Sequence, residues 1–485
     1  MNTSKRNLII VAVGIVVLGG TVAALTLTGG GTSAASSAAS AATVELVSKK
    51  SEDIVSMSVK NKKGSYTLIP VDKPAASSAA PAASGSSSGS TERTYTVQGL
   101  ENVPIDSTAA GQVIQNGFSL VASKNLGAID NLEEFGLKDP QATVEVSFKD
   151  GSNYNYKIGS ACATDSTSYY MCGENSNNVY VVSVDGGILD SESYFISKNV
   201  LAITNGSDDN DFTKISLSGK NFPQPITVAK TGTVNTITAP ISAEADPVKI
   251  QAIQTALATV TAASVEKVQP TAADLKTYGL DQPAAIVEFT VNKGSYKLMA
   301  GAKKDSNYYV MLDKVNVVYL ISADSISSWV STNAFTLQNK LLLLPTVTDV
   351  KAITVTQGGS PSALTVARTK DESKSTEDKP AYTYKVTSSG GKELDYETNY
   401  KNFYKNLIGL ELLEAANGKP VGAPVYTVEY QYFDKTAKDT IQFYKGAERR
   451  YIAVVNGRVY GVMVSSDVDK MISSYQQLQN GQPVA

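Results

Sequence analysis

Apolar and polar residues alternate along many short stretches of this chain, which is the pattern of half-buried strands. The clearest cases are Ala142–Phe148, Ala285–Val291 and Tyr426–Tyr432, in which every second residue is apolar. Successive side chains of a strand point to opposite faces, so each stretch predicts one face on a core and one in solvent. Short connections rich in turn residues predict that neighbouring strands pair antiparallel, as a meander.

A helical period interrupts the strands once in each third of the chain, over residues 107–121, 246–260 and 400–408. In the second of these, Asp246 is a suitable N-cap and Pro247 suits the first helical position. In the third, apolar residues follow the i, i+3, i+4, i+7 spacing of one helix face: Tyr400, Phe403, Tyr404, Leu407 and Ile408. Cap-forming sequences at Ser183, Ser322 and Ser465 predict one more helix after each strand block.

These elements recur three times and predict three tandem repeats. The openings Asp53–Val59, Asp211–Leu217 and Asp349–Val355 match one another. The predicted boundaries are 53–205, with a low-complexity disordered loop at 74–90, then 206–345, and a diverged third repeat at 346–485. Each is about the size of a small domain. The predicted fold class is α+β, an N-terminal transmembrane helix followed by three repeats, each an antiparallel meander sheet with covering helices.

A Gly-Leu-x-x-Pro motif marks the first two repeats and predicts a short helix that ends in a Schellman motif. The glycine would adopt the left-handed conformation, the leucine would pack back on the helix, and the proline would prevent its continuation. The residues concerned are Gly136, Leu137 and Pro140 in the first repeat and Gly279, Leu280 and Pro283 in the second. The third repeat lacks the motif and has Gly-Lys-Pro-Val-Gly-Ala-Pro at 418–424 instead.

The N-terminus predicts a membrane anchor. An uncharged run from Leu8 to Thr28 follows Lys5 and Arg6, and at about 1.5 Å per residue it reaches roughly 31 Å, the thickness of a bilayer core. Residues 1–28 are therefore assigned to a cytoplasmic tail and anchor, and 29–52 to a flexible stalk. The positive flank predicts a single-pass cell-membrane protein with its repeats on the extracytoplasmic side. A cleaved signal peptide is the alternative.

The composition of the chain excludes several kinds of catalytic and metal-binding site. The chain has 485 residues, a net charge of -3 and no histidine, which excludes histidine-based triads and histidine-ligated zinc. The weakly acidic balance does not favour nucleic acid as a partner. No phosphate-binding or dinucleotide motif is present, so the sequence predicts no catalytic, cofactor-binding or metal-binding residue and no cofactor. Cys162 and Cys172 lie in one short segment, where either a disulfide or two free thiols would fit.

Two tyrosine pairs are weak candidates for a binding surface: Tyr169 with Tyr170, and Tyr308 with Tyr309. Adjacent aromatic rings can offer a platform to glycans or wall polymer. The alternative is structural, because neighbouring residues of a strand point to opposite faces and one ring of each pair would then be core.

The Gly-Leu-x-x-Pro motif, the alternating strand, the glycine turn and the Tyr-Tyr pair together resemble the domain of unknown function 4340 family. The residues that carry the resemblance are Phe135–Leu137 with Pro140 and Tyr278–Leu280 with Pro283. The resemblance implies a bacterial membrane-anchored protein, often associated with ABC transporters of the gliding-motility type. It implies no catalytic residues.

Three functions remain open. The first is a non-enzymatic, membrane-anchored extracytoplasmic accessory or scaffold protein for an ABC-type transporter or another envelope complex, with protein partners. The second is a module that binds wall polymer or a small ligand in a groove between repeats. The third is a carboxylate-based hydrolase. A hydrolase needs two converging carboxylates in a deep cleft, a binding module needs an aromatic-lined groove, and a scaffold needs neither.

Overall fold

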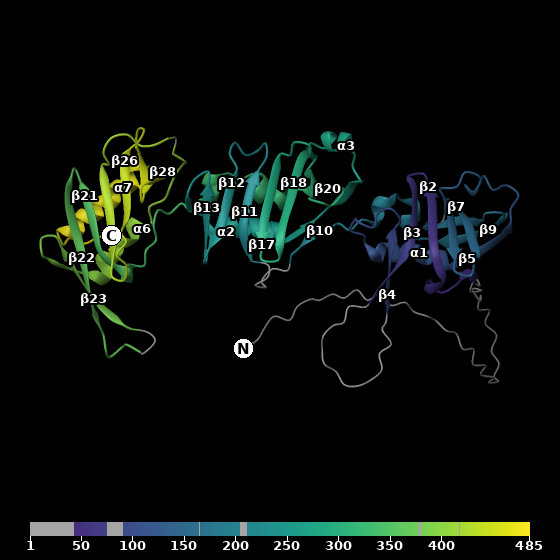
Figure 1. Ribbon diagram of the computed structural model, residues 1–485, viewed down its shortest axis with the longest axis horizontal. Helices are drawn as coiled ribbons and strands as arrows, with labels where there is room; N and C mark the ends of the chain where they lie inside the picture. Colours follow the sequence, from purple (N-terminus) through teal and green to yellow (C-terminus); the bar gives the residue numbers. More distant parts are fainter. Residues whose placement is uncertain (1–42, 75–90, 164, 204–210, 377–379, 417) are drawn as a thin grey trace, which may run out of the picture.

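Three sheet-rich units stand in a row in the computed structural model, with the N-terminal unit at one end and the C-terminal unit at the other (Figure 1). The structure describes residues 43–74, 91–163, 165–203, 211–376, 380–416 and 418–485. We call the three units first (residues 44–203), second (211–345) and third (346–485). Over this part the fold is α+β and dominated by antiparallel sheets with few helices.

The first unit contains a nine-stranded sheet in the order β1-β5-β9-β8-β7-β6-β2-β3-β4. All its strand pairs are antiparallel. Its strands are β1 (Val44–Ser48), β2 (Ile54–Asn61), β3 (Gly64–Pro74), β4 (Thr91–Val97), β5 (Ser119–Ala128), β6 (Ala142–Phe148), β7 (Asn153–Cys162), β8 (Asp165–Gly173) and β9 (Asn178–Ser183). Strands β6 to β9 form the antiparallel meander that the short connections predict.

The second unit repeats this arrangement in a nine-stranded sheet of order β14-β13-β12-β11-β17-β18-β19-β20-β16. Its strands are β11 (Phe212–Ser218), β12 (Ile226–Thr231), β13 (Val234–Ala239), β14 (Ala243–Glu244), β16 (Ser264–Val268), β17 (Ala285–Val291), β18 (Gly294–Lys304), β19 (Asn307–Leu312) and β20 (Val317–Ser322). A separate pair joins β10 (Asn199–Ala202), which leaves the first unit, to β15 (Thr259–Thr261) of the second.

The third unit has an eight-stranded sheet of order β24-β23-β22-β21-β25-β26-β27-β28. Its strands are β21 (Val350–Gln357), β22 (Ser360–Lys370), β23 (Tyr382–Ser388), β24 (Glu393–Leu394), β25 (Tyr426–Tyr432), β26 (Asp439–Lys445), β27 (Arg450–Val455) and β28 (Arg458–Val464). In all three units the central pairing is the same, since β2–β6, β11–β17 and β21–β25 join the opening strand to the strand after the covering helix.

Helices cover one face of each sheet and leave the other open. These covering helices are α1 (Ser107–Phe118), α2 (Pro247–Ala258), α4 (Ala323–Val330), α5 (Ala334–Leu337), α6 (Lys401–Ile408) and α7 (Ser465–Gln479), whereas the short α3 (Ala272–Thr277) lies at the end of the second sheet (Figure 1). The Asp246 carboxylate accepts from two backbone N–H groups of α2, as an N-cap does. The predicted helix after Ser183 is a 3-10 turn, Gly186–Leu189. On the open faces lie polar residues such as Glu145, Glu288 and Glu429.

Two large, separate hydrophobic cores lie in the described part of the row, and a small cluster of Leu137, Cys172 and Val179 lies apart from them in the first unit. The larger one runs without interruption through the first and second units, and the fully buried Trp329 belongs to it. The smaller core lies inside the third unit around Phe403 and Tyr430. The first two units therefore form one packed body, and the third unit adjoins it as a second body.

Each unit is joined to the next by a hydrogen-bonded exit segment. At the first joint (residues 196–203 with 258–262) the Ala262 N–H donates to the Lys198 carbonyl at 2.8 Å, and β10 pairs with β15. At the second joint (338–342 with 411–412) the Leu412 N–H donates to the Lys340 carbonyl at 2.9 Å, and residues 341 and 411 form a β-bridge. The two joints therefore share a backbone hydrogen bond to the exit segment, whereas only the first joint is also crossed by a continuous hydrophobic core.

The N-terminal expectations need correction. The predicted anchor, Leu8–Thr28, lies outside the described residues, and no helix in the described part is long and apolar enough to cross a bilayer. The predicted single-pass membrane localisation is corrected accordingly and has no part in the function proposed below. The predicted stalk, 29–52, lies outside the described residues up to residue 42 and differs from the structure after that, because Val44–Ser48 forms β1, the edge strand that pairs with β5. Of the predicted loop at 74–90, all but Pro74 lies outside the described residues.

Candidate functional site

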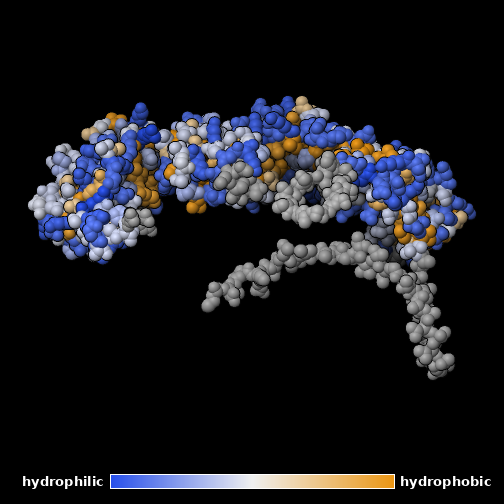
Figure 2. All heavy atoms as spheres, turned by 60° about the horizontal axis from the view of Figure 1, so that its bottom comes forward, coloured by the Kyte–Doolittle hydropathy of each residue, from blue (hydrophilic) through white to orange (hydrophobic). Residues whose placement is uncertain are grey.

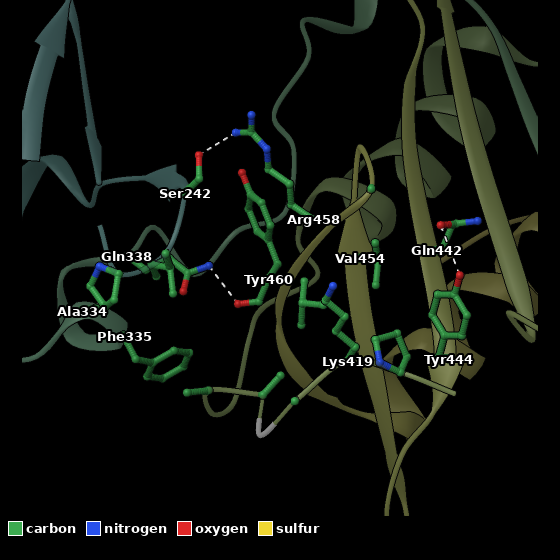
Figure 3. Close-up of a pocket in the computed structure, with 18 residues that line it drawn as sticks. Ser242, Ala334, Phe335, Gln338, Lys419, Gln442, Tyr444, Val454, Arg458 and Tyr460 are labelled. Atoms are coloured by element: carbon green, nitrogen blue, oxygen red, sulfur yellow. Dashed lines mark hydrogen bonds between the residues drawn. The ribbon is translucent and has the colours of Figure 1, made fainter. Parts of the chain in front are cut away.

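A cavity of about 750 Å³ lies at the second joint, between the second and third units (Figure 3). The second unit lines it with Pro240, Ile241, Ser242, Ala334, Phe335 and Gln338. The third unit lines it with Ala415, Ala416, Gly418, Lys419, Pro420, Gln442, Tyr444, Val454, Gly457, Arg458, Val459 and Tyr460. Its size is within the range of small-molecule sites, and such sites often lie between domains.

The wall from the second unit is set by the short helix α5. Asn333 caps this helix by accepting from the Thr336 N–H at 2.8 Å, and the helix ends where the exit segment becomes extended at Gln338. The Phe335 ring from α5 lies against the cavity, and the Lys340 ammonium lies 3.4 Å from the centroid of that ring. Lys340 also donates to the Phe335 carbonyl. Burial lowers the pKa of Lys340.

The wall from the third unit is the open face of its sheet. In β26, Ile441 and Phe443 are buried in the core, so the alternating residues Gln442 and Tyr444 face outward into the cavity. The Tyr444 hydroxyl donates to the Gln442 side-chain oxygen at 3.4 Å. Residues of the hairpin β27–β28 complete this wall (Figure 3).

Two side-chain hydrogen bonds cross the joint at the cavity. The Gln338 amide nitrogen donates to the Tyr460 carbonyl at 3.0 Å, and the Arg458 guanidinium donates to the Ser242 hydroxyl at 2.6 Å. Gln338 is only 1% exposed. The corresponding residue of the first joint is the buried Ile196, which forms the same backbone bridge, to Ile105, that Gln338 forms to Ala245. A buried amide in place of an isoleucine distinguishes the second joint chemically.

The charges at the cavity are all positive. Lys419 and Arg458 line it, and its lining as described contains no aspartate or glutamate. Burial raises the pKa of Tyr460, and the Glu244 charge adds to this effect, whereas a hydrogen bond with the Glu244 backbone and the charge of Arg458 oppose it. The cavity combines aromatic and aliphatic walls with two cations, which suits binding and lacks the pair of carboxylates that glycoside hydrolysis uses.

The tyrosine pairs expected from the sequence lie elsewhere. The Tyr170 ring packs edge-on against Phe135 with centroids 4.8 Å apart, and Tyr309 packs against Tyr278 at 4.5 Å. Tyr169 packs beside the main core and Tyr308 is 8% exposed within it. None of the four lines the cavity at the second joint. Within the described residues, all four tyrosines therefore make packing contacts with neighbouring side chains.

The Gly-Leu-x-x-Pro motifs form tight turns against the sheet. Gly136 and Gly279 have φ of +68° and +67°. The Leu280 N–H donates to Leu275 and the Gly279 N–H to Lys276, the two hydrogen bonds of a Schellman motif. The first unit repeats both bonds, although residues 132–136 form turns and no helix there. Leu137 and Leu280 are buried, while Pro140 and Pro283 follow in the connection to the next strand.

Both cysteines are free, buried thiols. Across the β7–β8 hairpin Cys172 stands opposite Lys157, and Cys162 stands opposite Asp165. Five residues of extended strand separate the two positions by roughly 16 Å, far beyond the Cα separation of about 7 Å that a disulfide tolerates. Burial raises the pKa of both thiols, which keeps them in the unreactive protonated form. No group of three or more metal-ligating side chains occurs within the described ranges.

Sequence reasoning missed the cavity, although one signal pointed to it. The segment that replaces the Gly-Leu-x-x-Pro motif in the third repeat, residues 418–424, begins at the cavity and supplies Gly418, Lys419 and Pro420 to its lining. The third repeat therefore departs from the sequence pattern of the first two at residues that line the cavity.

A protein-family model matches the part of the chain that includes the second-unit wall of this cavity. Residues 236–426 match a family model described as Domain of unknown function (DUF4340). The resemblance inferred from the sequence is confirmed over this stretch. The DUF4340 match begins in β13 and ends at the start of β25. It therefore includes the second-unit wall and the lining residues 415–416 and 418–420, and leaves out the β26–β28 wall. No curated protein and no solved structure matches the chain.

Proposed function

We propose that this protein is a non-enzymatic binding scaffold whose row of three units holds a ligand or partner at the second joint. The observation that carries the proposal is the cavity itself, an aromatic-lined space between two units with two cations and, among its described lining residues, no carboxylate. Domain interfaces are common places for ligand sites, and a few polar groups in an apolar lining give such sites their specificity.

The repeated joints support the scaffold part of the proposal. Backbone hydrogen bonds at both joints, at 2.8 Å and 2.9 Å, hold the exit segment of one unit on the next. Figure 2 shows a largely hydrophilic surface with several patches of hydrophobic residues, one of them on the side of the third unit that faces the second. A fixed spacing of units suits a protein that positions others. The ABC-type transporter association is implied by the family resemblance alone and supplies one class of protein partner.

The remaining alternative, a carboxylate-based hydrolase, predicts an outcome that can be measured. Purified full chain should be incubated with soluble wall glycans, polymers and peptides, and the mixture analysed by mass spectrometry. We expect every compound to be recovered intact, while compounds that bind raise the melting temperature of the third unit. The proposal would be overturned by cleavage that one Asp or Glu substitution abolishes without changing the circular dichroism spectrum.

A further inference from the structure

We propose that the second-joint cavity selects an amphipathic anion, with an apolar body against Phe335 and an acidic group at Arg458 and Lys419. The inference rests on the proposed binding function and names the chemical class of its ligand. Three properties of the cavity carry it: unpaired positive charge, an apolar wall and sufficient volume.

Among the described residues, the positive charge at the cavity is opposed only at longer range, by the Glu244 charge that also acts on Tyr460. Neither Lys419 nor Arg458 forms an ion pair in the described part of the chain. By contrast, Arg93, Arg368 and Arg450 each face a carboxylate within 3.6 Å. The bond to Ser242 uses one of the five N–H donors of the Arg458 guanidinium. The planar guanidinium can therefore still bind a carboxylate, sulfonate or phosphate group.

Arg458 is held in place by the hairpin that carries it. Asn456 and Gly457 have φ of +48° and +78°, the conformation of the Asn-Gly turn that favours a two-residue hairpin. Val455 and Arg458 pair across this turn at the start of β28. The Ser242 hydroxyl, from the second unit, then fixes the direction of the guanidinium (Figure 3). A positioned cation at the boundary of two units loses less side-chain freedom when an anion binds.

Beside the cations and the polar groups of Gln338, Gln442 and Tyr444, the lining offers apolar side chains that favour an elongated or flat hydrophobic body. Phe335 stands on the second-unit side, and Val454 and Val459 stand on the third-unit side. The ammonium of Lys340 lies over the Phe335 ring and donates to the backbone, so it is engaged beside the cavity. A purely inorganic anion would leave these walls unused, whereas a neutral hydrophobic molecule would leave two cations without a counter-charge.

The inference is tested with two probes that share an apolar body and differ in charge. These are 8-anilinonaphthalene-1-sulfonate, an anion, and N-phenyl-1-naphthylamine, its neutral analogue, titrated into the full chain by fluorescence. We expect the anion to bind at least about tenfold more tightly. The double substitution Arg458→Gln with Lys419→Gln should weaken the anion about tenfold and leave the neutral probe unchanged. Phe335→Ala should weaken both probes.

Three variants separate charge from folding. Ser242→Ala removes the hydrogen bond to Arg458 and keeps the charge, so it should retain most of the selectivity for the anion. Arg458→Lys should retain it as well. Lys470→Gln removes an exposed cation of α7, outside the lining of the cavity, and should change nothing. Equal binding of the two probes, or an anion affinity unaffected by the double substitution, would overturn the inference.

The outcomes distinguish this inference from the proposed function. If both probes bind equally and Phe335→Ala weakens both, the second joint still binds ligands and only the anion selectivity is wrong. If neither probe binds, the inference fails, and the hydrolysis assay described above then decides the proposed function by itself.

Discussion

Replacing Trp329 by alanine should lower the unfolding free energy of the first two units by about 3–5 kcal/mol. Trp329 is the only tryptophan of the chain and is fully buried. It belongs to α4, the helix that packs on α2, β17 and β20, and lies in the core shared by the first and second units. Truncation leaves a large cavity that the surrounding strands cannot close, which adds to the lost hydrophobic transfer energy.

The two separate cores make this prediction selective. Calorimetry of the full chain should show the transition of the first two units fall by about 5–10 °C, while the transition of the third unit stays in place. Phe403→Ala is the matched variant, because Phe403 is equally buried in the other core and should shift only the third unit. A single transition that moves as a whole in both variants would contradict the division into two packed bodies.

Replacing Gly301 by alanine should destabilise the second unit by about 1–3 kcal/mol through overpacking. A Cβ at this position would stand 2.2 Å from the Tyr278 carbonyl oxygen and 3.0 Å from Leu280. The Schellman turn would have to move off the sheet and lose the hydrogen bond from the Ala302 N–H to Tyr278. Chemical denaturation followed by circular dichroism measures the change.

The glycines at the equivalent strand position in the first and third units, and a second glycine of β18, serve as controls. Gly159→Ala should be equally harmful, because its Cβ would lie 2.2 Å from the Phe135 carbonyl. Gly446→Ala should be milder, since the third unit lacks the turn and the nearest atom is 3.2 Å away. Gly294→Ala, with nothing within 4 Å, should have little effect. If Gly446→Ala were as damaging as Gly301→Ala, this explanation of the repeated glycine would be wrong.

The sequence predicts local structure well where local chemistry decides it. The alternation in 142–148 and 285–291 anticipates β6 and β17, and Asp246 with Pro247 marks the start of α2. The Gly-Leu pairs anticipate turns whose glycines have positive φ. In each case the signal and its cause lie within a few residues of one another.

Features that depend on distant partners could not be derived in this way. Val44–Ser48 reads as the end of a stalk because five residues carry a weak pattern, and it becomes a strand only by pairing with β5. The cavity likewise needs α5, the 415–420 loop and the β26–β28 face to meet, which no local pattern encodes. From the sequence alone, Gln338 cannot be told from an exposed polar residue, because its burial depends on the joint between the second and third units.

The most direct test of the central claim, that the second joint is a fixed binding site between two units, is amide hydrogen exchange of the full chain. The Leu412 N–H, which donates to the Lys340 carbonyl at 2.9 Å, reports on this joint, and the Asn339 N–H, which donates to the Glu244 carbonyl at 2.9 Å, reports on how the exit segment is held within the second unit. Slow exchange in peptides covering 338–342 and 411–414, comparable with that of the sheet strands, is the predicted result. The irregular segment 418–424 should exchange fast and serves as the internal reference. Exchange of the joint peptides as fast as that segment would contradict the account.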